Sequence, residues 1–172
     1  DLEKNMMKKL IYLLPFVLLL TACPIGLDYA PGYVGKEAVS GNLIGTWQFQ
    51  PSDELNDTEV MLMKFTKRDA YSYNATVLER GELYSLETDE LIAYETKING
   101  LNVLYLVPSD ENKYYCQQYV LKNNKTLEVA DIPLLDGGSD SIQSTESLRK
   151  QIINSMNKPE FLKEVKTYVR KE

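Results

Sequence analysis

The sequence contains no histidine among its 172 residues. Histidine is the usual base beside serine and cysteine nucleophiles, a ligand in HExxH zinc sites, and the side chain that titrates near neutral pH. The absence of histidine therefore excludes these three kinds of site. Glycine-rich phosphate loops and dinucleotide-binding glycine motifs are also missing. We expect a protein that is not an enzyme, with no catalytic residue, no metal site and no cofactor.

Cysteine is scarce as well, because the chain has only Cys23 and Cys116. Small exported domains are often held together by several disulfides, and two cysteines cannot provide such a framework. Cys116 lies in an apolar-rich segment, so a buried and inert thiol is expected there, and a reactive thiol is the alternative.

Long hydrophobic runs are missing too. The longest apolar stretch, residues 10–20, is about half the length that a membrane-spanning helix needs, and it contains Pro15. Lys8 and Lys9 precede it and small residues follow it, which is the order of a secretory signal peptide. The alternative is a buried core helix over 10–20 with Cys23 as an ordinary thiol.

The tetrapeptide Leu20-Thr21-Ala22-Cys23 resembles the lipobox of bacterial lipoproteins. The resemblance implies that residues 1–22 are removed and that Cys23 is linked to diacylglycerol, with fatty acids such as palmitate as the membrane anchor. More than one acyl chain is needed for stable anchoring, and such a cysteine provides that. Pro24 stands where an aspartate would retain some Gram-negative lipoproteins in the inner membrane. The resemblance therefore implies the cell envelope, and in a Gram-negative cell the periplasmic face of the outer membrane.

Positive charge is in deficit. Without residues 1–22 the chain has 16 basic and 23 acidic residues, which argues against nucleic acid as a partner and against electrostatic adhesion to anionic lipid. About 150 residues suit one domain with a core of its own. We expect a monomer whose partners are the membrane, through Cys23, and either an apolar small molecule or an envelope protein.

The pattern along the mature chain predicts a tether followed by one mainly β domain. Residues 23–42 show neither helical nor strand periodicity and are expected to be the lipidated cysteine and a flexible tether. From residue 43 to 172 we expect the domain. Asn99-Gly100 between two β-like segments is a strong hairpin signal. Strands are predicted at residues 43–50, 59–65, 70–79, 91–98, 101–107, 113–121 and 126–132.

Seven or eight consecutive strands with short connections predict an antiparallel up-and-down meander. Such a meander closes into a small barrel or folds into a sandwich, because open edges aggregate. Residues 141–156 have apolar side chains at helical spacing, and Asn157-Lys158-Pro159-Glu160 reads as the start of a second helix that continues to Val169. We therefore expect one or two C-terminal helices, packed on the outside or the open end of the sheet.

The segment Leu43-Ile44-Gly45-Thr46-Trp47 resembles the Gly-x-Trp signature that opens the first strand of lipocalins and related calycins. The resemblance implies a lipocalin-like barrel in which Gly45 allows a close turn at the base and Trp47 closes that end. The arginine that packs across this tryptophan in the family has no counterpart between Lys113 and Ile132, where the basic residues are all lysines. The alternative is that Trp47 is a plain core residue.

Tyrosine is abundant, and the candidate ligand-binding residues come from this group. A tyrosine side chain has an apolar body and one polar tip, which suits cavity mouths and interfaces, although tyrosine is also simply frequent in strands. Gln117 shares a strand face with Tyr115 and Tyr119. If that face is interior, it is a ligand-orienting patch, and if it is exterior, it is a binding surface. The candidate residues are Tyr73, Tyr105, Tyr115, Gln117 and Tyr119.

Three functional hypotheses follow from these patterns. The first is a non-enzymatic envelope lipoprotein whose barrel binds an apolar small molecule. The second is a protein-interaction module, such as an inhibitor or assembly accessory, displayed on a lipid tether. The third is an enzyme that uses carboxylate, lysine or tyrosine chemistry, since no histidine is available.

Overall fold

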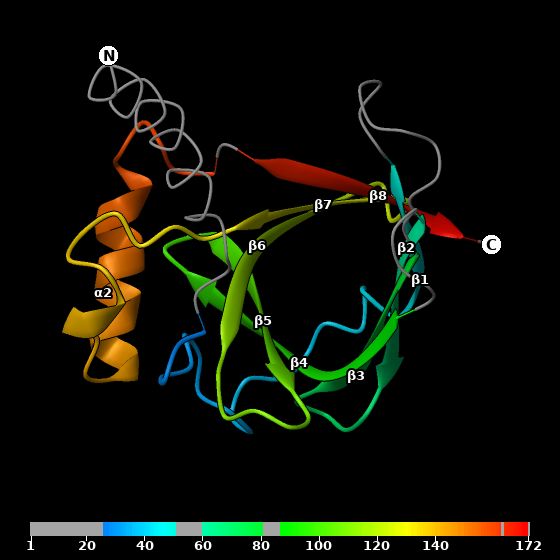
Figure 1. Ribbon diagram of the computed structural model, residues 1–172, viewed down its shortest axis with the longest axis horizontal. Coiled ribbons are helices and arrows are strands. Elements are labelled where there is room, and N and C mark those ends of the chain that lie inside the picture. The colour runs from blue at the N-terminus through cyan, green and yellow to red at the C-terminus, as the bar shows by residue number, and fades with distance from the viewer. Residues whose placement is uncertain (1–25, 51–59, 81–86, 163, 172) are drawn as a thin grey trace, which may run out of the picture.

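The computed structural model describes residues 26–50, 60–80, 87–162 and 164–171. Eight antiparallel strands follow one another around a closed barrel, and the last pairs with the first (Figure 1). The predicted mainly β meander is therefore confirmed, and it forms a barrel and not a sandwich. The strands are β1 (Gly45–Gln50), β2 (Val60–Lys67), β3 (Tyr73–Arg80), β4 (Glu87–Ile98), β5 (Leu101–Pro108), β6 (Tyr115–Lys122), β7 (Thr126–Asp131) and β8 (Val165–Lys171).

The predicted hairpin at Asn99-Gly100 joins β4 to β5. Ile98 pairs with Leu101, and the two turn residues have φ angles of 48° and 84°. A two-residue turn with positive φ at both positions matches the right-handed twist of the flanking strands, and asparagine and glycine adopt that conformation most readily. This turn lies at the end of the barrel that we call the base, where β1 begins. The opposite end, where β1 ends and β4 and β6 begin, is called the mouth.

Alternating side chains along each strand point into the barrel and form its core. Completely buried side chains gather in the half of the interior toward the base. Neighbouring aromatic rings make edge contacts there, as between Phe65 and Tyr73, whose ring centroids are 5.9 Å apart. The side chains of this core with no solvent exposure are Leu43, Trp47, Phe65, Tyr73, Ala93, Leu104 and Leu127.

The prediction of a second C-terminal helix is wrong. Residues 165–171 form β8, which pairs with β1 on one side and β7 on the other and so closes the barrel. Tyr168 points inward and is 4% exposed, while Val165 is exposed. The spacing of apolar residues in this segment fits a strand as well as a helix. The edges of β1 and β7 decide for the strand, because pairing with β8 gives partners to the backbone groups of residues 46–50 and 126–130.

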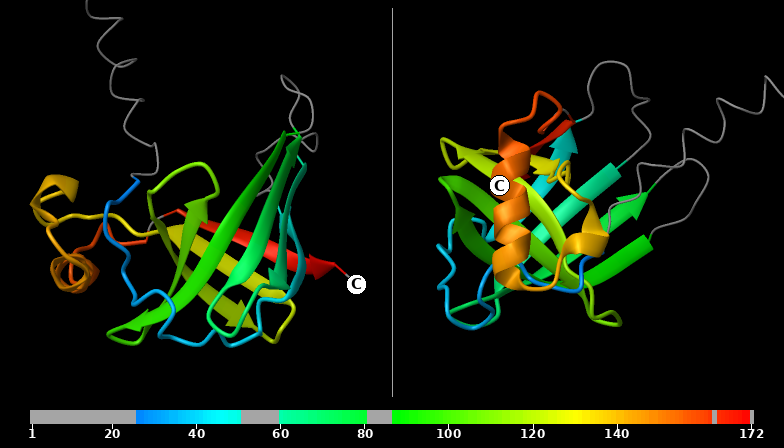
Figure 2. Two further views of the ribbon diagram at one scale, coloured as in Figure 1. Left: turned by 90° about the horizontal axis from the view of Figure 1, so that it is seen from below. Right: turned by 90° about the vertical axis from the view of Figure 1, so that its left-hand side faces the viewer.

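One C-terminal helix is present, α2 (Thr145–Met156), and it packs on the outside of the barrel as expected (Figure 2). Its N-terminus is a capping box in which Ser144 and Ser147 bond each other's backbone N–H groups. Leu148 and Ile152 are completely buried against apolar side chains at the base end of β4 and β5. Among the described residues, none of the helices combines the length and apolar character that crossing a bilayer requires.

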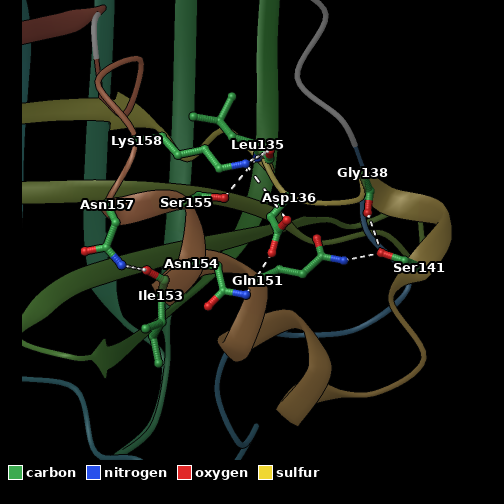
Figure 3. A network of polar contacts seen from close by, with 10 residues as sticks. All are labelled: Leu135, Asp136, Gly138, Ser141, Gln151, Ile153, Asn154, Ser155, Asn157 and Lys158. Atoms are coloured by element: carbon green, nitrogen blue, oxygen red, sulfur yellow. Dashed lines mark hydrogen bonds and ion pairs between the residues drawn. The ribbon is translucent and has the colours of Figure 1, made fainter.

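Polar contacts tie the connection between β7 and α2 to the helix (Figure 3). The backbone N–H of Leu135 donates to Ser155 Oγ at 2.9 Å, and Asn154 donates to Asp136 at 2.8 Å. Lys158 also donates to the carbonyl of Leu135. These bonds hold the helix close to the barrel wall between the end of β7 and the beginning of β8.

The base of the barrel is closed by Trp47 and Arg170. The Trp47 ring is completely buried, and its indole N–H donates to the carbonyl of Leu43 at 2.8 Å. The guanidinium carbon of Arg170 lies 4.3 Å from the centroid of the Trp47 ring. An arginine therefore does pack across the tryptophan, and it comes from β8 and not from the region between Lys113 and Ile132, where no candidate was found. Gly45 has a φ of 137°, and a Cβ atom at this position would lie 2.7 Å from a guanidinium nitrogen of Arg170. Glycine therefore leaves room for the arginine.

The described part of the expected tether, residues 26–42, packs on the barrel as part of the domain. Leu27 and Tyr114 exchange backbone hydrogen bonds of 2.9 Å beside the start of β6. Arg149 of α2 donates to the carbonyl of Pro31 at 2.8 Å. Leu27 is only 5% exposed and belongs to the apolar cluster on the outside of the barrel. Apolar residues can therefore be buried on a sheet even where their spacing in the sequence is irregular. Residues 35–45 then run across the base, as the light blue and cyan segment of Figure 1 shows.

Candidate functional site

A carboxylate lies inside the barrel wall. Glu95 of β4 shares the inward face of its strand with Leu91 and Ala93, and it is 6% exposed. Its two oxygens accept hydrogen bonds from the Ser40 backbone N–H and hydroxyl, and from the hydroxyls of Tyr73 and Tyr119 at 3.2 and 2.8 Å. A buried carboxylate is costly unless it is hydrogen-bonded, and these four donors satisfy it without a cation.

The two tyrosines of this cluster are kept in the protonated form. Burial raises the pKa of Tyr73 to about 12, and the nearby Glu95 carboxylate adds to the shift. Burial and the Glu95 carboxylate also raise the pKa of Tyr119. The Tyr73 hydroxyl in turn accepts a hydrogen bond of 2.8 Å from the backbone N–H of Gly41. Ser40 and Gly41 belong to the segment that crosses the base, so these hydrogen bonds also hold that segment against the barrel.

Four of the five predicted site residues lie on the inward face of the barrel. Tyr73 and Tyr119 meet at Glu95, whereas Tyr115 and Gln117 lie nearer the mouth on β6. The Tyr115 hydroxyl donates to Glu111 at 2.8 Å, and the Gln117 amide donates to Asp131 at 2.9 Å. The face of β6 that carries Tyr115, Gln117 and Tyr119 is therefore interior, and it bears polar groups from the mouth down to Glu95.

Tyr105, the fifth predicted residue, lies on the outer face of β5. It is 1% exposed and stacks on Tyr94 at a centroid distance of 5.1 Å, under the N-terminal segment. A Cβ on Gly32 would come within 3.0 Å of its hydroxyl. Burial raises the pKa of Tyr105. The structure therefore separates Tyr105 from the other four residues by the thickness of the barrel wall.

The interior toward the mouth is apolar and only partly buried. Phe49, Met61, Val77 and Leu91 pack against the buried core, yet each keeps some exposure. The Phe49 ring lies 5.6 Å from that of Tyr168. The interior thus has two parts: apolar side chains that keep some exposure toward the mouth, and a buried polar cluster deeper in the barrel whose tyrosine hydroxyls donate to Glu95. The apolar part can contact a hydrophobic molecule.

Glu95 and Ser40 are the residues that sequence reasoning missed. A signal for Glu95 existed, because a charged residue at the inward position of an apolar strand is unusual. Ser40 had no signal, since its role comes from the path of residues 35–45 across the base. Within the described part of the chain, no three acidic or cysteine side chains lie close enough to hold a metal ion.

The arrangement defines a class of protein by its shape. The closed eight-stranded antiparallel barrel, with one helix on its outside and a tryptophan and an arginine at its base, is lipocalin-like in shape. Comparison of the chain with models of protein families, with characterised proteins and with solved structures finds no match.

Proposed function

We propose that this protein is a non-enzymatic lipoprotein of the cell envelope that binds an apolar small molecule in the mouth half of its barrel. One observation carries the proposal: along β1 to β4, burial of the inward side chains falls from complete toward the base to partial toward the mouth. Trp47 and Phe65 have no exposure, whereas Phe49 and Leu91 keep some. Contact with an apolar ligand would remove this remaining surface from water, which stabilises a complex by about 25 cal/mol per Å².

The buried polar cluster adds an electrostatic preference for the charge of the ligand. Glu95 is acidic and its neighbours there are the hydroxyls of Tyr73 and Tyr119. The Glu95 oxygens already accept four hydrogen bonds, so the carboxylate acts on a ligand through its charge, which disfavours an anionic group in a low-dielectric interior. The ligand class supported best is an apolar molecule whose polar end is neutral or cationic.

The experiment is native mass spectrometry of the full chain, extracted from its own membrane in mild detergent. We expect a retained molecule of defined mass. Leu91→Trp fills the interior toward the mouth and should abolish retention, while Ile92→Trp adds bulk at the next position of the same strand, on the outer face, and should preserve it. A wild-type protein that carries no molecule, or equal retention by the two variants, would overturn the proposal.

A second function, protein interaction, is favoured by one surface. Tyr29, Tyr33 and Val34 are 39%, 41% and 45% exposed and belong to one short segment. Tyrosine is enriched at protein interfaces. Photo-crosslinking from position 34 in intact cells would give one reproducible adduct if this segment binds a protein, and only lipid or no adduct if it does not.

A further inference from the structure

The N-terminal segment enters the domain at the mouth. Leu27 pairs with Tyr114, directly before β6, and Asp28 forms an ion pair of 2.5 Å with Lys113. A Cβ on Gly26 would lie 3.1 Å from the Tyr115 hydroxyl, whose ring packs against the barrel core. From there the segment runs down the outside to the base, as the blue trace in the left panel of Figure 2 shows.

The chain between Cys23 and this point is very short. Two residues lie between Cys23 and Gly26, so three Cα–Cα steps join them, and an extended chain spans at most about 11 Å over that length. Strand β6, of 8 residues, spans about 20 Å along the axis of a barrel with normally tilted strands. An anchor on Cys23 is therefore tied to the mouth and is too short to reach the base.

We propose that the lipid anchor holds the mouth of the barrel against the bilayer surface, so that the apolar ligand passes between the barrel and the membrane. The inference rests on the proposed function, because it uses acylation of Cys23 and an apolar ligand. The partner is the bilayer, and the ligand class narrows to molecules that dissolve in a bilayer, such as single- or double-chain amphiphiles.

Exposed residues near the mouth suit a lipid interface. Val165, at the mouth end of β8, is 51% exposed, and Tyr29, two residues beyond Leu27, is 39% exposed. Tyrosine suits the headgroup region of a bilayer because its ring is apolar and its hydroxyl remains in contact with water. The exposed valine adds apolar surface at the same end. No excess of positive charge is needed for this contact, since the covalent anchor supplies the attraction.

The test measures which end of the barrel faces the lipid. The full acylated chain is placed in vesicles of phosphatidylethanolamine and phosphatidylglycerol that contain a headgroup-spin-labelled lipid. A fluorophore is attached through Asp110→Cys at the mouth or through Lys125→Cys at the base, both exposed positions. Cys116 competes poorly for the label, because burial raises the pKa of its thiol to about 12. We expect the spin label to cause a large loss of emission at position 110 and little at position 125. Equal loss at both, or greater loss at 125, would overturn the proposal.

A spacer provides the matched control. Insertion of about ten glycine and serine residues after Ile25 adds a flexible reach of about 18 Å. The spaced protein should lose the difference in emission between the two labels, and an unchanged difference would show that the anchor does not set the orientation. This readout needs no ligand. If the mouth faces the membrane but native mass spectrometry finds no bound molecule, the proposed function fails and the orientation stands. If a molecule is bound but the base faces the membrane, the proposed orientation fails and the proposed function stands.

Discussion

Replacement of Arg170 by methionine tests whether the base of the barrel depends on one side chain. The guanidinium donates to the carbonyls of Ile44, Asn42 and Asn124 at 2.6, 2.8 and 2.8 Å, and it covers the Trp47 ring at 4.3 Å. The side chain thus ties β8 to the N-terminal segment and to the turn between β6 and β7. Methionine keeps the apolar contact with the ring and removes all three hydrogen bonds.

The expected loss follows from these contacts. Hydrogen bonds from a charged donor to buried groups are worth about 1.5–3 kcal/mol each, but Arg170 is partly exposed and water can replace it, so about 0.5–1 kcal/mol each is appropriate. The cation–π contact adds about 0.5–1 kcal/mol. The free energy of unfolding should therefore fall by about 2–4 kcal/mol. Arg170→Lys keeps the charge but cannot reach three carbonyls, so we expect about half of that loss.

The assay is urea unfolding followed by the fluorescence of Trp47, the only tryptophan of the chain. The slope of the free energy against urea should stay constant, since the surface exposed on unfolding is unchanged. Lys125→Met serves as the control for the loss of a surface charge, because its side chain is exposed and the variant keeps the backbone carbonyl that accepts a hydrogen bond of 2.9 Å from the Arg170 N–H. A loss below about 0.5 kcal/mol for Arg170→Met, or equal losses for methionine and lysine, would refute this account of the base.

Three further predictions concern buried groups. Glu95→Gln should lower the free energy of unfolding by about 1–3 kcal/mol, because an amide NH₂ would face hydroxyl donors; urea unfolding checks this, and an unchanged or raised stability would contradict it. Tyr73 has a pKa of about 12 against 10.0 in an ordinary phenol, so its contribution to stability is present below pH 10 and is lost as the pH rises toward 12. Ultraviolet titration should show a delayed group of tyrosines, and a single step near pH 10 would be the opposite result. Cys116, with a pKa raised by burial to about 12, should react with a thiol reagent far more slowly in the folded than in the unfolded chain at pH 8, and equal rates would exclude a protected thiol.

Much of the fold could be predicted from local patterns. Alternating residues predicted seven strands close to their observed bounds, and Asn99-Gly100 marked the turn between β4 and β5. The spacing of Leu148 and Ile152 predicted α2 and its buried face. These features are local, because side-chain period and turn conformation depend on neighbouring residues in the chain. The role of Cys23 lies outside the described residues and stays a prediction.

Other features depended on contacts between distant segments. Residues 165–171 could form a helix or a strand by spacing, and the open edges of β1 and β7 selected the strand. That choice also placed Arg170 over Trp47, a pairing across 123 positions of sequence that no local pattern indicates. Residues 26–42 lacked any period and still packed on the barrel wall.

The candidate site likewise has some features that follow from local sequence patterns and others that depend on contacts between distant segments. Sequence alone grouped Tyr115, Gln117 and Tyr119 on one strand face, since side chains two positions apart share a face. It could not determine whether that face was inside, nor that Tyr105 would lie outside, because the direction of barrel closure sets both. Glu95 became the centre of the cluster only when the segment with Ser40 crossed the base and its donors reached the carboxylate. The sequence by itself determined which residues share a face, and the closure of the barrel decided which of those faces met, because hydrogen-bonded edges and a common core act over distances along the chain that local propensity does not reach.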